Sequence, residues 1–111
     1  MTKEDKDCLN LLKKEVDATV KGLEEAAHGD YETFADYLDD NFGIKIRIDG
    51  NFHYLSTEIT FGIGGPGIWF DTANGTVYGK WGADLEFSKM VDFETCDAVD
   101  DYFEEYYTAC R

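Results

Sequence analysis

Two stretches in the middle of the chain decide the fold: GIKIRIDGNFHYLSTEITF at residues 43–61 and IWFDTANGTVYGKW at residues 68–81. In the first, Ile44, Ile46 and Ile48 alternate with charged residues, which is typical of a strand with one buried face. The turn signal at 49–51 and a second alternating run complete a β-hairpin. The second stretch predicts another hairpin, closed at 73–75, and a short fifth strand is expected at 83–87.

Helical periodicity flanks this central region on both sides. Apolar residues recur every three or four positions over 3–27, 31–41 and 92–110, with Asp30 and Asp92 as expected N-caps. On the last segment the expected buried stripe consists of Cys96, Val99, Phe103, Tyr106 and Cys110. The element order ααββββα predicts one α+β domain over residues 1–111, in which an antiparallel sheet of four to five strands carries the helices on its buried face in two layers.

The charge of the chain points to the kind of partner. Ten Lys and Arg stand against 24 Asp and Glu in 111 residues, giving a net charge of −14. Seven acids and no Lys or Arg occupy 24–42, and nine acids with one Lys occupy 84–105. Such a field repels nucleic acid and anionic membranes and attracts basic protein surfaces. A basic protein is therefore the expected partner, and the alternative is an acidic surface that serves solubility or adaptation to high salt.

Several motifs invite a catalytic or cofactor reading that the sequence does not favour. The loop GIGGPG at 62–67 matches GxGxxG, but it opens a strand, whereas dinucleotide binding needs a helix there. His28 and His53 lie in different elements, and three widely spaced cysteines form no metal motif, so buried free thiols are expected. We therefore expect no enzyme, metal or cofactor, and, from the charged start of the chain, a cytoplasmic protein.

The last predicted helix combines acids with tyrosines outside its apolar stripe. Tyrosine often anchors protein interfaces, because it buries a large area at a small entropic cost. The alternative is that these tyrosines edge the core with their hydroxyls in water. The predicted partner-binding residues are Asp97, Asp100, Asp101, Tyr102, Glu104, Glu105 and Tyr107, with Asp36, Asp39 and Asp40 on the second helix.

The chain resembles small acidic proteins of phages and mobile elements that inhibit host defence, the anti-CRISPR and antirestriction group. The resemblance rests on size, on the two acidic blocks, and on the segments GGPGIWFDTANGTVYGKWGAD at 64–84 and CDAVDDYFEEYY at 96–107. It implies a stoichiometric inhibitor, often a DNA mimic, that occupies the basic nucleic-acid channel of a Cas effector.

Two other classes of function remain open. An immunity protein or antitoxin is also small and acidic and also covers a basic nuclease. A small enzyme would require a deep pocket with a few convergent polar groups.

Overall fold

The computed structural model describes residues 2–82 and 84–110. Helices α1 (Lys3–Ala27) and α2 (Tyr31–Asp39) precede five strands, and helix α3 (Phe93–Cys110) follows them. The strands are β1 (Gly43–Ile48), β2 (Tyr54–Gly62), β3 (Gly67–Asp71), β4 (Thr76–Trp81) and β5 (Leu85–Met90). The predicted α+β order is confirmed, and the sheet has five strands, within the predicted four to five. β5 begins later and runs further than the predicted 83–87, and Ala83 lies outside the described residues.

The sheet is an antiparallel meander in which each strand pairs with its neighbours in sequence, in the order β1-β2-β3-β4-β5. The GIGGPG loop joins β2 to β3 as a third hairpin. At the β3–β4 turn the Gly75 amide donates to the Asp71 carbonyl at 2.9 Å, and Gly75 has the positive φ of 65° that favours glycine. At the β1–β2 turn the positive φ belongs to Phe52, not to Gly50.

The helices begin at residues whose side chains satisfy the free backbone amides of the first turn. Asp30 caps α2 by accepting from the Thr33 amide at 2.8 Å. Asp92 caps α3 by accepting from the Thr95 amide at 2.7 Å. Both predicted caps are confirmed.

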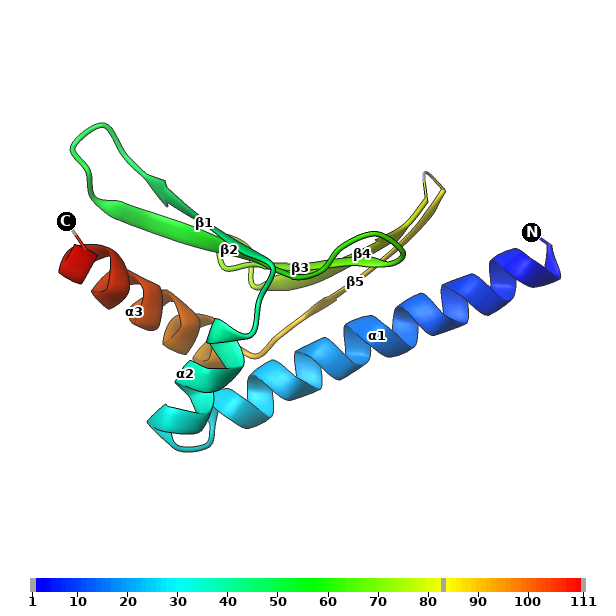
Figure 1. Cartoon of the computed structure of the whole chain (residues 1–111), viewed down its shortest axis with the longest axis horizontal. Helices are drawn as coiled ribbons and strands as arrows, with labels where there is room; N and C mark the ends of the chain where they lie inside the picture. Colours follow the sequence, from blue (N-terminus) through cyan, green and yellow to red (C-terminus); the bar gives the residue numbers. More distant parts are fainter. Residues whose placement is uncertain (1, 83, 111) are drawn as a thin grey trace.

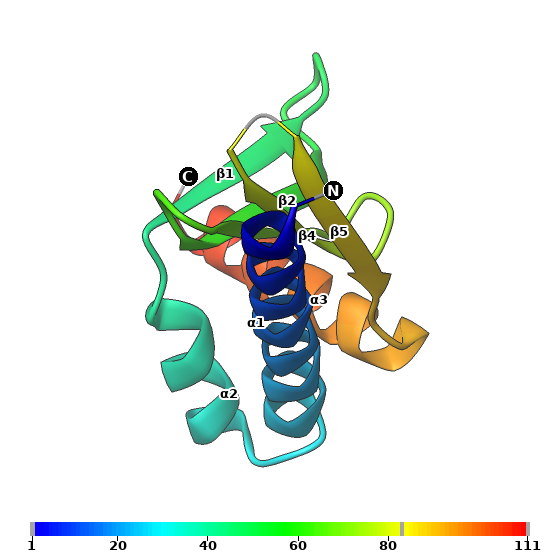
Figure 2. The same cartoon turned by 90° about the vertical axis from the view of Figure 1, so that its right-hand side faces the viewer.

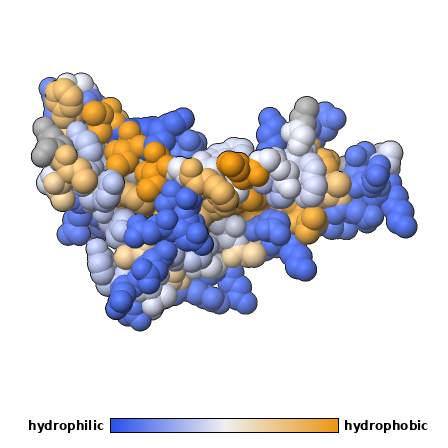
Figure 3. All heavy atoms as spheres, viewed as in Figure 1, coloured by the Kyte–Doolittle hydropathy of each residue, from blue (hydrophilic) through white to orange (hydrophobic). Residues whose placement is uncertain are grey.

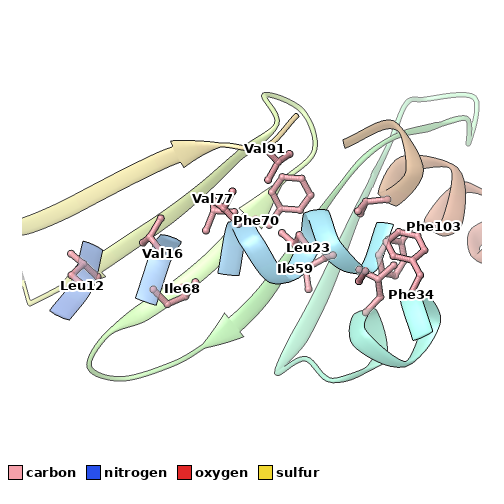
Figure 4. Packing of buried hydrophobic residues seen from close by; sticks show 14 residues of the cluster. Leu12, Val16, Leu23, Phe34, Ile59, Ile68, Phe70, Val77, Val91 and Phe103 are labelled. Atoms are coloured by element: carbon pink, nitrogen blue, oxygen red, sulfur yellow. The ribbon is translucent and has the colours of Figure 1, made fainter. Parts of the chain in front are cut away.

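The helices lie on one face of the sheet and leave the other face open (Figures 1 and 2). α1 packs across β4 and β5, whereas α3 packs on β2. Between the layers, side chains of α1 interlock with those of the central strands and of α3 (Figure 4). α1 lies close against β4 at Gly79, where a Cβ atom would lie 2.5 Å from Val16 Cγ2 and 2.8 Å from Leu12 Cδ1.

Two expectations about the buried stripe of α3 are wrong. Its buried residues are Thr95, Val99 and Phe103, whereas Tyr106 is 52% exposed and Cys110 is exposed. α3 packs on α1 and β2 through its buried residues, whereas Tyr106 and Cys110 in its last turns stay exposed. Cys96 is half-buried: its thiol donates to the Thr72 carbonyl at 3.3 Å, and burial raises its pKa to about 11.

Candidate functional site: an acidic helical surface

The exposed acids of α3 lie on one side of the helix. At about 100° per residue they fall within an arc of about 100°, opposite the buried stripe. This α3 arc consists of Glu94, Asp97, Asp101, Glu104 and Glu105, all exposed. From Glu94 to Glu105 it extends about 17 Å along the helix axis. The arc therefore presents a single row of carboxylates to solvent.

Asp100 does not belong to this row. It is half-buried, and it accepts a hydrogen bond from the Tyr54 hydroxyl at 2.7 Å. The same hydroxyl lies 2.6 Å from Thr57 Oγ1, and burial, reinforced by Asp100, raises the pKa of Tyr54. The structure thus uses Asp100 to hold α3 against β2, although sequence reasoning placed it with the partner-binding acids.

Both predicted tyrosine anchors make contacts within the chain. The Tyr102 ring packs edge-on against Phe34 and Phe103, and its hydroxyl donates to Asp39 Oδ1 at 3.3 Å. Burial, then Asp39, raises the pKa of Tyr102. The Tyr107 hydroxyl donates to the Phe52 carbonyl at 2.9 Å. These tyrosines fasten α3 to α2 and to the β1–β2 turn, and each remains half-exposed.

The Tyr102–Asp39 contact joins the second predicted acidic group to the first. Asp36, Asp39 and Asp40 are all exposed at the end of α2. Between the two helices an open groove of about 340 Å³ is lined by the rings of Tyr31, Phe34 and Tyr102 and by Asp30, Asp101 and Glu105. α2 and α3 together carry nine acids and no Lys or Arg. All of these acids except Asp100 are exposed, and the eight exposed ones form one acidic surface, called here the α2–α3 surface.

The basic side chains of the sheet lie away from this surface and are paired. On the open face of the sheet, Arg47 donates to both oxygens of Asp71 at 2.8 and 3.1 Å, and this hydrogen bonding raises the pKa of Arg47. On the same face Lys45 lies 3.6 Å from Glu58, and Lys80 lies 3.8 Å from its cross-strand neighbour Glu86. The open face is consequently close to neutral, and the net negative charge is concentrated on the helical side.

Two features of the surface were missed by sequence reasoning. On the open face of the sheet, Trp69 and Tyr78 stack with their ring centres 5.5 Å apart. Along β1, Ile44 and Ile48 are 40% and 39% exposed, although their alternation predicted a buried face. Period-two alternation indicates that a strand has two unlike faces, but it carries no information on whether a helix covers the apolar one.

The described residues provide no clustered metal ligands. Within 2–82 and 84–110, no group of three or more His, Cys, Asp or Glu is placed to hold a metal ion. His28 Nε2 lies 3.2 Å from Asp92 Oδ2, and His53 Nδ1 lies 3.3 Å from Asp49 Oδ2, so the two histidines sit in separate surroundings. The same part of the chain contains no helix long and apolar enough to cross a membrane.

Comparison with known proteins identifies no relative: no family model, no curated protein and no solved structure matches this chain.

Proposed function

We propose that this chain is a stoichiometric inhibitor whose α2–α3 surface occupies a basic nucleic-acid-binding site of a bacterial defence nuclease, with a CRISPR–Cas effector as the expected target. The observation that carries the proposal is the segregation of charge: nine acids and no Lys or Arg on α2 and α3. A surface used for solubility alone needs no such separation from the paired charges of the sheet.

The density of charge along the α3 arc supports mimicry of DNA. One strand of B-DNA carries about one phosphate per 3.4 Å of helix axis, or about five over 17 Å. The α3 arc carries five carboxylates over about the same length. Cas effectors hold nucleic acid in positively charged channels, and they use arginines to read the short DNA motif (the PAM) that flanks the target. A row of carboxylates at this density along one helix is suited to oppose several of those cations at once.

The test measures competition with DNA. Guide-loaded Cas effectors are titrated with the chain while binding of a labelled target duplex is followed by fluorescence anisotropy. We expect the duplex to be displaced and association of the chain to slow as salt rises, because exposed charges are screened within about 8 to 10 Å. Simultaneous binding of chain and duplex, with neither weakening the other, would refute the proposal.

Matched variants locate the surface. The first variant neutralises three acids of the α3 arc, Asp97→Asn, Asp101→Asn and Glu104→Gln. The control removes the same charge from exposed positions of α1, Glu4→Gln, Asp7→Asn and Glu15→Gln. At about 0.5 to 1 kcal/mol per interfacial charge, the first variant should bind roughly 10- to 100-fold more weakly. The control should bind almost as the original does, and both should keep the original melting temperature.

The same variants examine the immunity-protein alternative. If the chain does not bind Cas effectors but binds a nuclease toxin through the α3 arc, the acidic surface is still the binding site and the target is the toxin. If the α3 variant and the α1 control bound every partner with equal affinity, the acidic surface would serve solubility and not binding.

A further inference from the structure

β1 is an edge strand of the sheet. Among the described residues it pairs with β2 alone, so one side of its backbone has no strand beside it. Unpaired amides and carbonyls along a sheet edge accept an additional strand, which is a common mode of peptide recognition. β5 forms the opposite edge and provides an internal comparison.

The side chains of β1 make this edge apolar. Ile44 and Ile46 lie opposite Ile59 and Thr57 of β2, which are buried on the helix-facing side of the sheet. The helices pack on β2, β4 and β5, so this side of β1 extends past the layer that would cover it. We call Phe42, Ile44, Ile46 and Ile48 the β1 strip; Phe42 is 66% exposed. Figure 3 shows the apolar strip along this edge of the molecule.

A second copy of the chain is a poor occupant of this edge. In antiparallel self-pairing, residues on the same face lie opposite one another. The two registers with the greatest overlap over Gly43–Ile48 place Lys45 opposite Lys45 or Lys45 opposite Arg47. Like charges directly opposite one another destabilise a pair of strands, and edge lysines commonly prevent such pairing. The net charge of −14 on each copy adds further repulsion.

The surroundings of the β1 strip indicate the chemistry of its partner. Asp39 and Asp40 end α2 just before Phe42, so the strip begins beside acids. Figure 3 shows the hydrophilic surface of α2 below the apolar strip, on the same face of the molecule. An apolar centre with a charged border is the usual anatomy of a protein interface. A complementary segment is therefore extended and apolar, with Lys or Arg at the end that lies near α2.

We propose that β1 receives an extended segment of the basic partner as a sixth, antiparallel strand, whose apolar side chains lie against the β1 strip and whose basic C-terminal end reaches α2. The basic character of the partner rests on the proposed function, whereas strand addition rests on the edge itself. Exposed apolar strips of this kind mark interaction sites on soluble proteins.

Synthetic peptides separate the two contributions. The strand peptide is TVTVTVGRRR, the control TPTPTPGRRR has the same tail but cannot form a ladder, and both are titrated into the isotope-labelled chain by NMR. We expect the strand peptide to bind about tenfold more tightly than the proline peptide and to slow amide exchange at Gly43–Ile48 but not at Leu85–Met90. Ile44→Thr with Ile48→Thr should abolish that tenfold difference. Met90→Thr, at a residue 68% exposed on the other edge, should retain it.

The remaining outcomes each contradict strand addition. Equal binding of the two peptides, with changes confined to α2 and α3, would overturn it and leave the proposed function standing. No binding of the strand peptide would also overturn it, and the DNA competition assay would then decide the proposed function independently. Dimerisation of the free chain that Ile44→Thr with Ile48→Thr abolishes would assign the edge to a second copy and overturn the peptide assignment.

Discussion

Gly79→Ala should destabilise the protein by about 1 to 2 kcal/mol, because α1 crosses β4 without room for a Cβ atom. The new methyl carbon would lie 2.5 Å from Val16 Cγ2, 2.8 Å from Leu12 Cδ1 and 3.2 Å from Ile68 Cδ1. Favourable contacts between carbon atoms occur at about 3.5 to 4.0 Å, so Val16 must move by about 1 Å. Valine in a helix has one strongly preferred rotamer, so the helix itself must shift.

The magnitude follows from two opposing effects. Overpacking a core by one methyl group costs about 1 to 3 kcal/mol. Replacing glycine by alanine within a strand returns about 0.5 to 1 kcal/mol of conformational entropy. The net loss should lower the melting temperature by about 4 to 8 °C per kcal/mol in a domain of this size. Urea denaturation at fixed pH measures the free energy of unfolding directly.

The control and a double mutant make the test specific. At Gly43 of β1 an added Cβ would meet no atom within 4 Å, so Gly43→Ala should leave stability unchanged or slightly higher. Val16→Ala removes the nearest contact, so it should cost less in the presence of Gly79→Ala than alone. Additive losses, or a Gly79→Ala protein as stable as the original, would refute the close approach of α1 to β4.

Three further measurements test other parts of the structure. Gly75→Val should cost about 1 to 2 kcal/mol in urea denaturation, because Gly75 has a φ of 65° that β-branched residues resist; an unchanged midpoint would contradict this turn. Tyr54→Phe should lower the free energy of unfolding by about 1 to 2 kcal/mol, because it removes the hydroxyl bonded to Asp100. An unchanged stability would show that this hydrogen bond does not hold α3 to β2. The hydrogen bond from the Thr95 amide holds the pKa of Asp92 at about 2, below its usual 3.8, so the unfolded chain binds more protons in this range. The stability from Asp92 should therefore be complete above about pH 4 and decline towards pH 2, and Asp92→Asn should remove this decline from thermal unfolding curves.

Local sequence was sufficient to predict most of the fold. Alternation over 43–61 predicted a hairpin, and the structure has β1 and β2 there. Asp30 and Asp92 were predicted as N-caps, because a short side chain before an apolar helical stripe satisfies free amides within three residues. Such features depend on near neighbours in sequence, so the sequence alone contains the information. The β1–β2 turn was harder, because its positive φ falls on Phe52.

The candidate site was predicted less completely. The acidic character of α2 and α3 is a property of composition, and helical periodicity placed the acids of the α3 arc on one side. The inward use of Asp100 depends on Tyr54, which lies 46 residues away in the sequence. The use of Tyr102 depends on Asp39, 63 residues away. Periodicity within α3 cannot distinguish an acid that faces solvent from one that meets a hydroxyl of the sheet.

The sequence by itself therefore determined the elements, the N-caps of α2 and α3, the order of the elements and the sign and amount of charge, because each of these is set by composition or by residues within a few positions of one another. Tertiary structure alone decided which strand lies at the edge, which glycine lies under a closely packed helix, and which acids remain on the surface. These properties depend on which distant segments pack together. The exposed isoleucines of β1 are the plainest case: their neighbours Thr57 and Ile59 on β2 are buried, because α3 packs on β2 and the helical layer does not extend over β1.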